Sequence, residues 1–312
     1  MISEIILSTI LSLTPADKKI VENLETRLKK DGYDISQYAN DSRFQIYKFE
    51  KGKKFTNYAD TTQSWYLKKA SLEQCADFIE EQYHWLKRAQ DKYGPSPEHI
   101  TSQLQLETNL GQYTGERPLI NSFISVYLDR PDRRREFYIY LKDFLDLFTD
   151  TTDNIILPKD IFEIKGSWAG AYGIAQGMPG IIKRYGKNAD GDGDGFFNPM
   201  NIPDAIEFLC LVLNGNGSRK SLSKATHGYN PGDPFYKNGI GKHAKALEKI
   251  MEKRSRIPPE KINYNIKPRI ENIQLPPRDN LQDLKITAMI QQPMPKKSFI
   301  RRIIPNLRIG KR

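Results

Sequence analysis

The sequence contains few of the residues on which several protein classes depend. Only two cysteines and four histidines occur among 312 residues, which excludes a disulfide-stapled small domain and a cysteine-rich zinc module. No apolar run approaches the roughly 18 residues that a membrane-spanning helix needs. The chain also has no Gly-x-Ser-x-Gly elbow, phosphate loop or dinucleotide fingerprint. Serine-hydrolase, nucleoside-triphosphatase and nicotinamide-dependent chemistries therefore lack support.

The net charge of +10 belongs to one end of the chain. Residues 253–312 hold 15 Lys and Arg against four Asp and Glu, whereas residues 1–252 hold 33 and 34. Eight prolines and no sustained periodicity accompany the basic residues, so we expect 253–312 to be an extended, disordered tail. Such a tail suits anionic envelope polymer or a membrane surface. Nucleic acid is not expected, because its binders usually carry charge on a folded face beside stacking aromatics.

Residues 17–252 are expected to form a mainly α-helical domain. Apolar residues repeat at helical spacing over 71–93 and 135–148, and no window alternates for long enough to form a central strand. Cys75 and Cys210 fall on apolar stretches and are expected to be buried free thiols.

The first 16 residues admit two interpretations. The apolar run Ile5–Leu13 is followed by Thr-Pro-Ala, which fits an export signal cleaved near Ala16, although the basic start of such signals is missing. The same run also fits an amphipathic first helix packed on the domain.

The stretch 96–111 is expected to form a helix with a carboxylate, that of Glu107, on its apolar face. Ser96 suits a helix N-cap and Gly111 a helix stop. Ile100, Leu104 and Glu107 fall at i, i+4 and i+7, so Glu107 shares the face of the apolar residues. Desolvation and the negative helix end should both raise the pKa of this carboxyl group, as a general acid requires near neutral pH. The alternative is a Glu paired with a nearby Lys or Arg.

The run DGDGDGFFNPMN (190–201) follows the spacing of an EF-hand-like calcium loop. Three carboxylates crowded this tightly repel one another without a cation. A neutral Asn stands where the loop usually ends in a bidentate Glu, which favours weak, structural binding. The alternative is a solvated Asp-Gly turn. The expected calcium ligands are Asp190, Asp192, Asp194, the Phe196 carbonyl, Asn198 and Asn201.

Four segments together resemble the lytic murein transglycosylases of the membrane-bound lytic transglycosylase B family. They are ETNLG (107–111), GSWAGAYGIAQGMP (166–179), the loop 190–201 and Tyr229-Asn230, in the family's order. The resemblance is best over residues 60–250. It implies a lysozyme-like fold and an enzyme that cleaves the β-1,4 bond between N-acetylmuramic acid and N-acetylglucosamine. The cleavage adds no water and closes a 1,6-anhydro ring on the muramic sugar. It also implies that Glu107 is the single acid/base and that the substrate contacts are Ser167, Gln176, Tyr229 and Asn230.

The chain departs from the family pattern at two points. Leu110 replaces the usual aromatic residue, and a second family tyrosine has only imperfect counterparts in Tyr236 and His243. Two alternatives stay open: a hydrolytic muramidase on the same scaffold, with Asp129 or Asp132 as second carboxylate, and a non-catalytic, calcium-stabilised wall-binding module. The expected partner is the peptidoglycan glycan strand, and the expected location is the cell envelope.

Overall fold

The structure is a computed structural model that describes residues 14–39, 41–47, 65–150, 154–231 and 234–255. Most of the expected signal segment 1–16 and most of the expected tail 253–312 therefore lie outside the described residues, and the domain boundaries stay predictions. The last described helix continues to Ser255, three residues into the expected tail. None of the described helices combines the length and the apolar character needed to cross a membrane.

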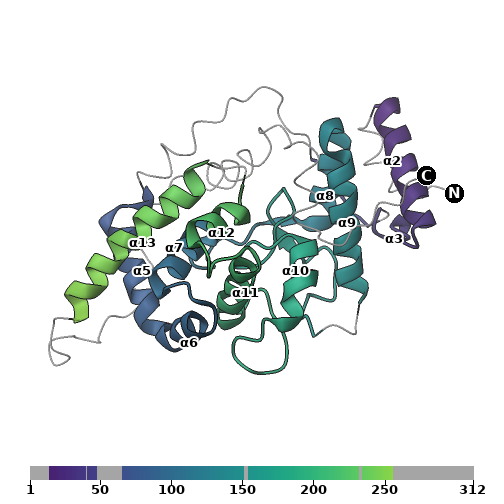
Figure 1. The fold of residues 1–312 in the computed structure, drawn as a ribbon. Coiled ribbons are helices and arrows are strands. Elements are labelled where there is room, and N and C mark those ends of the chain that lie inside the picture. The colour runs from purple at the N-terminus through teal and green to yellow at the C-terminus, as the bar shows by residue number, and fades with distance from the viewer. Residues whose placement is uncertain (1–13, 40, 48–64, 151–153, 232–233, 256–312) are drawn as a thin grey trace.

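Helices dominate the described part of the chain (Figure 1), which confirms the predicted mainly α class. Two-residue strands β1 (Arg117–Pro118) and β2 (Lys165–Gly166) pair antiparallel, with Arg117 opposite Gly166. In chain order the helices are α2 (Pro15–Lys30), α3 (Ser36–Ala39), α5 (Lys69–Glu81), α6 (Tyr83–Tyr93), α7 (Pro97–Thr108), α8 (Leu119–Asp129), α9 (Arg134–Thr149), α10 (Pro179–Tyr185), α11 (Ile202–Gly215), α12 (Leu222–Tyr229) and α13 (Pro234–Ser255), with short 3-10 turns η1 (Pro131–Arg133) and η2 (Gly186–Asn188).

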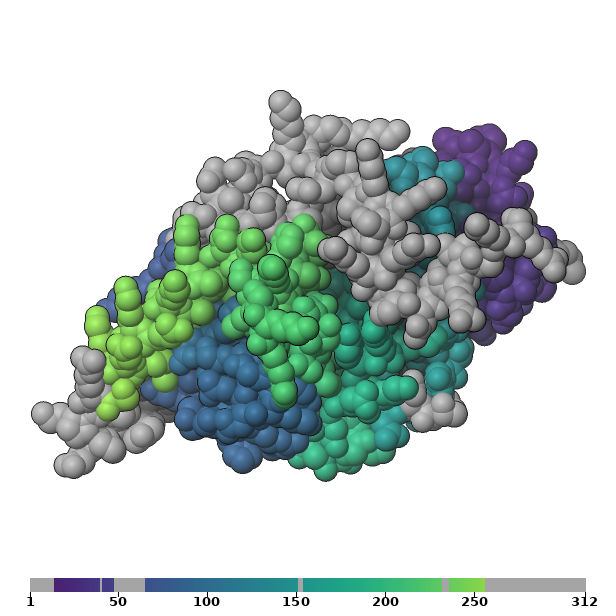
Figure 2. Space-filling model, in the orientation of Figure 1, coloured from purple at the N-terminus to yellow at the C-terminus, as the bar shows by residue number. Residues whose placement is uncertain are grey.

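Helix α7 lies at the centre of one half of the molecule. Ten of its twelve residues are buried, and it packs against α5, α6, α11 and α13. Figure 2 shows α12 and α13 on the outer face of this half. A helix buried on all sides needs partners for its polar side chains. The Gln105 amide donates to Ser71 Oγ over 3.0 Å, and His99 Nε2 lies 2.9 Å from Thr226 Oγ1. The helix that carries Glu107 is thereby fixed from several sides.

The other half is built on α8, α9 and α10, and α2 lies beside it (Figure 1). The end of α2 is attached to α9 by polar contacts. Tyr138 Oη and Lys142 Nζ both donate to Asp31, over 2.8 and 2.7 Å, and Tyr33 Oη donates to Asp146. A large core of buried apolar side chains runs through both halves. A smaller cluster stands apart beneath the end of α7, made of Tyr66, Leu106, Tyr236 and Ile240.

Two helix predictions need correction at their ends. The single helix expected over 71–93 is two helices, because Gln82 (φ −103°, ψ 15°) leaves the helical conformation. Helix α7 ends at Thr108 and not beside Gly111. Asn109 and Leu110 already adopt left-handed conformations, with φ of 52° and 57°. Asn tolerates this region, whereas a leucine there is strained.

The thiol predictions are confirmed, since Cys75 and Cys210 are both free and buried.

Candidate active site

Glu107 lies in the last turn of α7 and is half-buried. The hydroxyl of Tyr236, from α13, donates a hydrogen bond to its Oε1. Tyr236 is only 2% exposed, and its oxygen also accepts a hydrogen bond of 2.9 Å from the Gln103 amide nitrogen. The carboxylate therefore meets a neutral donor that is held in place by another side chain.

A second tyrosine lies beside the first. The rings of Tyr229 and Tyr236 are parallel, 1° apart in plane, with centroids separated by 6.2 Å. The Tyr229 hydroxyl donates to the Ala175 carbonyl over 2.5 Å. Burial, and then the negative charge of Glu107, raises the pKa of both hydroxyl groups well above the usual value. Both phenols stay neutral, so they serve as hydrogen-bond donors.

The Gly-rich segment 166–180 forms a series of tight turns next to these residues. Gln176 itself has a left-handed φ of 52°. Its Nε2 donates to the carbonyls of Thr114 and Gly173, over 3.1 and 2.9 Å. Ser167 is buried, and its Oγ accepts from the Ala171 amide over 2.9 Å. These bonds fix the side chains of Ser167 and Gln176 in two successive turns of the Gly-rich segment.

The end of α7 is bonded directly to this turn. Thr108 Oγ1 donates to the Ile174 carbonyl over 2.7 Å and accepts from the Gly111 amide over 3.0 Å. Because Thr108 follows Glu107 and Ile174 lies two residues before Gln176, the two sequence motifs form one structural unit.

The acidic loop brings three carboxylates together. Oxygens of Asp190, Asp192 and Asp204 all lie within 4.8 Å of one another. Asp204, at the start of α11, is 1% exposed. Its two oxygens accept from the amides of Gly191 and Asn198, each over 2.7 Å. Burial raises the pKa of Asp204 to about 6, and these two amide donors oppose the shift.

The donor set of this loop fits a hard cation. Carboxylate and amide oxygens are the ligands that calcium prefers. The Nδ2 of Asn201 donates to Asp192 over 2.8 Å, and its Oδ1 is buried with no hydrogen-bond partner among the described residues. An orphaned oxygen beside three carboxylates is a suitable additional ligand. The Asp194 carboxylate accepts from the Phe196 amide over 2.8 Å and is not one of the three converging carboxylates.

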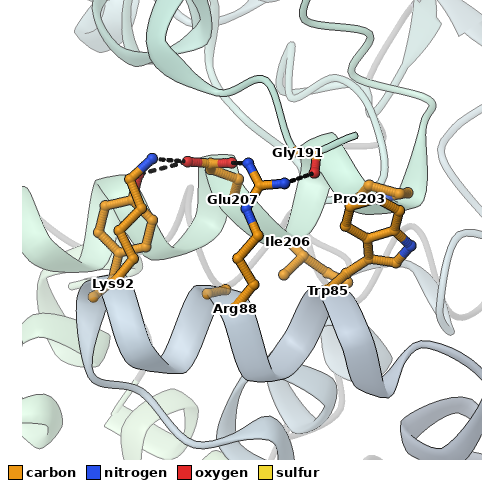
Figure 3. A pocket seen from close by; sticks show the side chains of 9 residues that line it. Trp85, Arg88, Lys92, Gly191, Pro203, Ile206 and Glu207 are labelled. Atoms are coloured by element: carbon orange, nitrogen blue, oxygen red, sulfur yellow. Dashed lines mark hydrogen bonds and ion pairs between the residues drawn. The ribbon is translucent and has the colours of Figure 1, made fainter. Parts of the chain in front are cut away.

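A polar clamp holds the acidic loop against α6 (Figure 3). Arg88 donates to the Gly191 and Asp190 carbonyls, over 3.1 and 3.4 Å. Glu207 of α11, nearly buried, lies 3.6 Å from Arg88 Nη2 and accepts from Lys92 Nζ over 2.5 Å. The pocket in this region belongs to the clamp, and Glu107 is not among its lining residues.

Comparison with known proteins assigns the family. Residues 17–262 match the family described as the transglycosylase SLT domain. The chain belongs to this family. A curated relative is membrane-bound lytic murein transglycosylase B of Escherichia coli, which is 31% identical over 151 residues. That match covers 48% of this chain and 40% of the relative, so the chain matches well under half of the relative's length.

Solved structures of transglycosylases share the fold. The E. coli lytic transglycosylase SLT35 in complex with bulgecin A aligns with a TM-score of 0.62 and 17% identity, over 77% of this chain and 95% of that one. Its complex with calcium gives a TM-score of 0.61 over the same shares. Soluble SltB1 of Pseudomonas aeruginosa gives 0.61 at 18% identity, over 75% and 99%. The predicted resemblance and the predicted lysozyme-like fold are confirmed.

Within the transglycosylase SLT domain of this chain, the predicted site residues fall into two groups. Glu107 and Tyr229 both interact with Tyr236, and Tyr229 bonds to Ala175, next to Gln176. Asn230 directly follows α12, and its Oδ1 is buried without a partner among the described residues. The roles predicted for these residues stay predictions.

Ser167 belongs to the Gly-rich segment that carries Gln176, but it has no hydrogen bond to Glu107 among the described residues. Its Oγ accepts from the Ala171 amide, within the same Gly-rich segment. Its predicted role also stays a prediction.

Sequence reasoning missed three residues that the structure brings to these sites. Tyr236 was an imperfect match, because it follows Tyr229 by seven residues across a break between helices. Gln103 lies four residues before Glu107, and that spacing could have identified it as a neighbour on one helix face. Asp204 lies three residues beyond the predicted calcium loop 190–201 and is not among the expected ligands. Its position after a loop and before an apolar helix is the signal that was available.

Proposed function

We propose that this protein is a lytic transglycosylase that cleaves the bond between N-acetylmuramic acid and N-acetylglucosamine in peptidoglycan and leaves 1,6-anhydro ends. The observation that carries the proposal is the environment of Glu107. It is a half-buried carboxyl group at a helix end, held by a neutral tyrosine donor and bonded through Thr108 to the turn that contains Gln176. Family membership supports the same reaction.

The proposed mechanism uses one carboxyl group twice. Protonated Glu107 gives its proton to the glycosidic oxygen, and the bond to C1 of the muramic sugar breaks. The resulting carboxylate then takes the proton of the C6 hydroxyl group, and the C6 oxygen bonds to C1. The N-acetyl group of the substrate stabilises the positive charge at C1 between these steps. Gln176, Tyr229, Asn230 and Ser167 would hold the sugars in place.

A hydrolytic reaction would need a second carboxylate near the reacting carbon. Asp132, one candidate, pairs with Arg130 over 2.9 Å, and this partner lowers the pKa of its carboxyl group. An exposed, ion-paired carboxylate on η1 is a poor match for a buried nucleophile or base, which argues against Asp132 in that role.

Product analysis tests the proposed reaction. We expect digestion of purified peptidoglycan to release fragments that are lighter by one water than hydrolysis products, because the ring closes in place of water addition. Mass spectrometry before and after borohydride reduction measures this, since anhydro ends resist reduction. Reducible ends would establish a muramidase, and binding without any release would establish a wall-binding module.

We further propose that the acidic loop binds calcium as a structural ion. Asp190, Asp192 and Asp204 would hold it together with Asn201, with the Asp194, Phe196 and Asn198 ligands expected from the loop pattern. The relative SLT35 is known in complex with calcium. When bound, the ion would neutralise the carboxylates and pin the loop between the Gly-rich turn and α11.

Calcium removal should lower the melting temperature more than the activity measured well below melting. Binding to the folded state alone adds about 2.7 kcal/mol at a hundredfold excess over Kd, which corresponds to about 5–10 °C for a domain of this size. Thermal melts with calcium, magnesium and chelator measure the effect. Asp192→Ala should abolish it, whereas Asp91→Ala, an exposed aspartate paired with Lys87 on α6, should keep it. Superimposable melts of the parent protein would refute the site.

We propose the cell envelope as the location, with the basic tail as an attachment to anionic polymer or a membrane surface. The deletion that tests this should begin after 262, because Arg254 of α13 pairs with Glu73, Asp77 and Glu80 of α5 and belongs to the folded domain. We expect the deletion to spare cleavage of soluble fragments and to reduce retention on whole walls in low salt. Exposed charges are screened within about 8 Å at physiological ionic strength, so the difference should vanish as salt is added. Unchanged retention at low salt would refute the attachment.

A further inference from the structure

A buried glutamine lies behind the candidate acid/base. Gln103 is completely buried on α7, one helical turn before Glu107. Its amide nitrogen donates to the Tyr236 oxygen over 2.9 Å, and Tyr236 donates to Glu107 Oε1. The three side chains form a chain of hydrogen bonds within the α7–α13 contact. Burying an amide group lowers the stability of the fold unless the amide forms hydrogen bonds.

The inventory of donors fixes the direction of this chain. The phenol oxygen of Tyr236 has one proton and accepts through its lone pairs. Because the Gln103 N–H points at the oxygen, the only Tyr236 proton is directed to Glu107. A reversed amide would place its carbonyl against the phenol and would draw that proton away from Glu107. An ionised carboxylate has no proton to offer and needs the donor.

We propose that Gln103 is a positioning residue: it holds the Tyr236 oxygen as an acceptor, aims the Tyr236 proton at Glu107 Oε1, and so assigns the transferable proton of Glu107 to Oε2. This inference rests on the proposed acid/base role of Glu107. In the ionised state Oε1 already accepts the hydrogen bond from Tyr236. A proton bound to Oε1 itself would therefore clash with the Tyr236 hydroxyl group. The exchange with the sugar oxygens then occurs at Oε2, in both halves of the reaction.

The residues around this chain of hydrogen bonds exclude water from it and keep the groups other than Glu107 uncharged. Leu106 and Ile240 are buried in the same small cluster as Tyr236. Tyr229 and Tyr236, the titratable groups on α12 and α13 that feel the charge of Glu107, have a raised pKa and remain neutral. His243, farther along α13, contacts Ser102 of α7 over 2.7 Å, and burial lowers the pKa of its ring to about 4. The neighbouring phenols and the His243 ring are therefore uncharged near neutral pH, and a change of charge in this group belongs to Glu107 in the proposed reaction.

The test reads the protonation of Glu107 without any substrate. Infrared difference spectra between the parent and Glu107→Gln isolate the Glu107 carboxyl band, which is followed against pH. Gln103→Met removes the donor, so Tyr236 becomes a weaker donor and its oxygen becomes able to accept from protonated Glu107. We expect the titration midpoint to rise by roughly half a pH unit, a fraction of the one to two units that a charge-assisted hydrogen bond supplies. The pH profile of peptidoglycan cleavage should shift equally.

Gln105→Met is the matched control. Gln105 is a second buried glutamine on α7 whose amide donates to Ser71 and not to Tyr236. It should lose comparable stability and leave the midpoint unchanged. In a Tyr236→Phe background, Gln103→Met should add no shift. Equal shifts for Gln103→Met and Gln105→Met, or no shift for either, would overturn the proposal.

A measurement on the parent keeps the test decisive if Gln103→Met does not fold. The phenol C–O band of Tyr236, from parent minus Tyr236→Phe spectra, distinguishes a hydroxyl group that both donates and accepts from one that only donates. We expect the first pattern, and the second would overturn the proposal. The test also distinguishes failure of this proposal from failure of the proposed reaction. If the reaction is wrong, the parent protein releases no anhydro products, but the titration of Glu107 still responds to Gln103→Met.

Discussion

Replacing Glu107 by Gln should reduce peptidoglycan cleavage by about 10²–10⁴-fold, the range that general acid–base catalysis contributes. The amide keeps the shape of the side chain, and its carbonyl oxygen still accepts from Tyr236. It cannot give a proton to the glycosidic oxygen or take one from the C6 hydroxyl group. Because one residue serves both steps in the proposed reaction, its loss blocks both. Release of anhydro fragments per unit time measures the effect.

The control for this variant lies on the same helix. Glu98 is in the first turn of α7, and Glu98→Gln removes a carboxylate at the opposite end from the site. We expect cleavage close to that of the parent, with a small loss of stability from the helix dipole. Glu107→Gln should melt close to the parent. Cleavage by Glu107→Gln within tenfold of the parent would show that another group is the acid/base.

Gly173→Ala should lower the melting temperature of the domain by roughly 4–20 °C. Gly173 has a φ of +78°, and an added Cβ would lie 2.6 Å from the Pro199 carbonyl oxygen. Left-handed strain costs about 1–2 kcal/mol and overpacking about 1–3 kcal/mol. At 2–4 °C for each kcal/mol in a domain of this size, the sum gives the expected fall. Thermal unfolding followed by circular dichroism measures it.

Gly217→Ala separates strain from contact. Gly217 has a similar φ of +87°, but nothing lies within 4 Å of an added Cβ. It should show only the strain, a fall of roughly 2–8 °C. Gly173→Ala should also impair cleavage, since the Gly173 carbonyl accepts from the Gln176 side chain and the Ile174 amide donates to the Pro199 carbonyl of the acidic loop. Equal melting temperatures for the two variants would show that the backbone shifts near Pro199 and relieves the close contact of the added Cβ at no cost in stability.

Local signals predicted much of the fold. The helical spacing over 135–148 corresponds to α9, from Arg134 to Thr149, and the Ser96 cap begins α7 as expected, with its Oγ accepting from the His99 amide. The break at Gln82 was not predictable, because apolar residues continue on both sides of it. Its cause is tertiary: α5 packs on α13 and α6 on α11, which sets two helix directions.

The sequence predicts candidate site residues where one segment carries the signal, and it misses contacts where two distant segments meet. Glu107 stands in a compact motif, whereas its contact with Tyr236 joins residues 129 positions apart. The acidic loop was recognisable from its spacing, but its register favoured Asp194, and only the folded backbone brings Asp204 beside Asp190 and Asp192. Periodicity describes one element at a time, so contacts between elements need the structure.

The left-handed leucine at position 110 has a consequence for directed evolution. A strained residue close to the reacting group persists only while its surroundings impose the conformation. Relieving the strain at position 110 would therefore make the folded protein more stable to heat. Leu110→Asn would relax the backbone, and a screen for survival at high temperature should enrich it. A screen for turnover should retain Leu110, because its side chain packs against the core and so helps to hold the end of α7, three residues after Glu107. The two selections would then lead the same protein to different residues at one position.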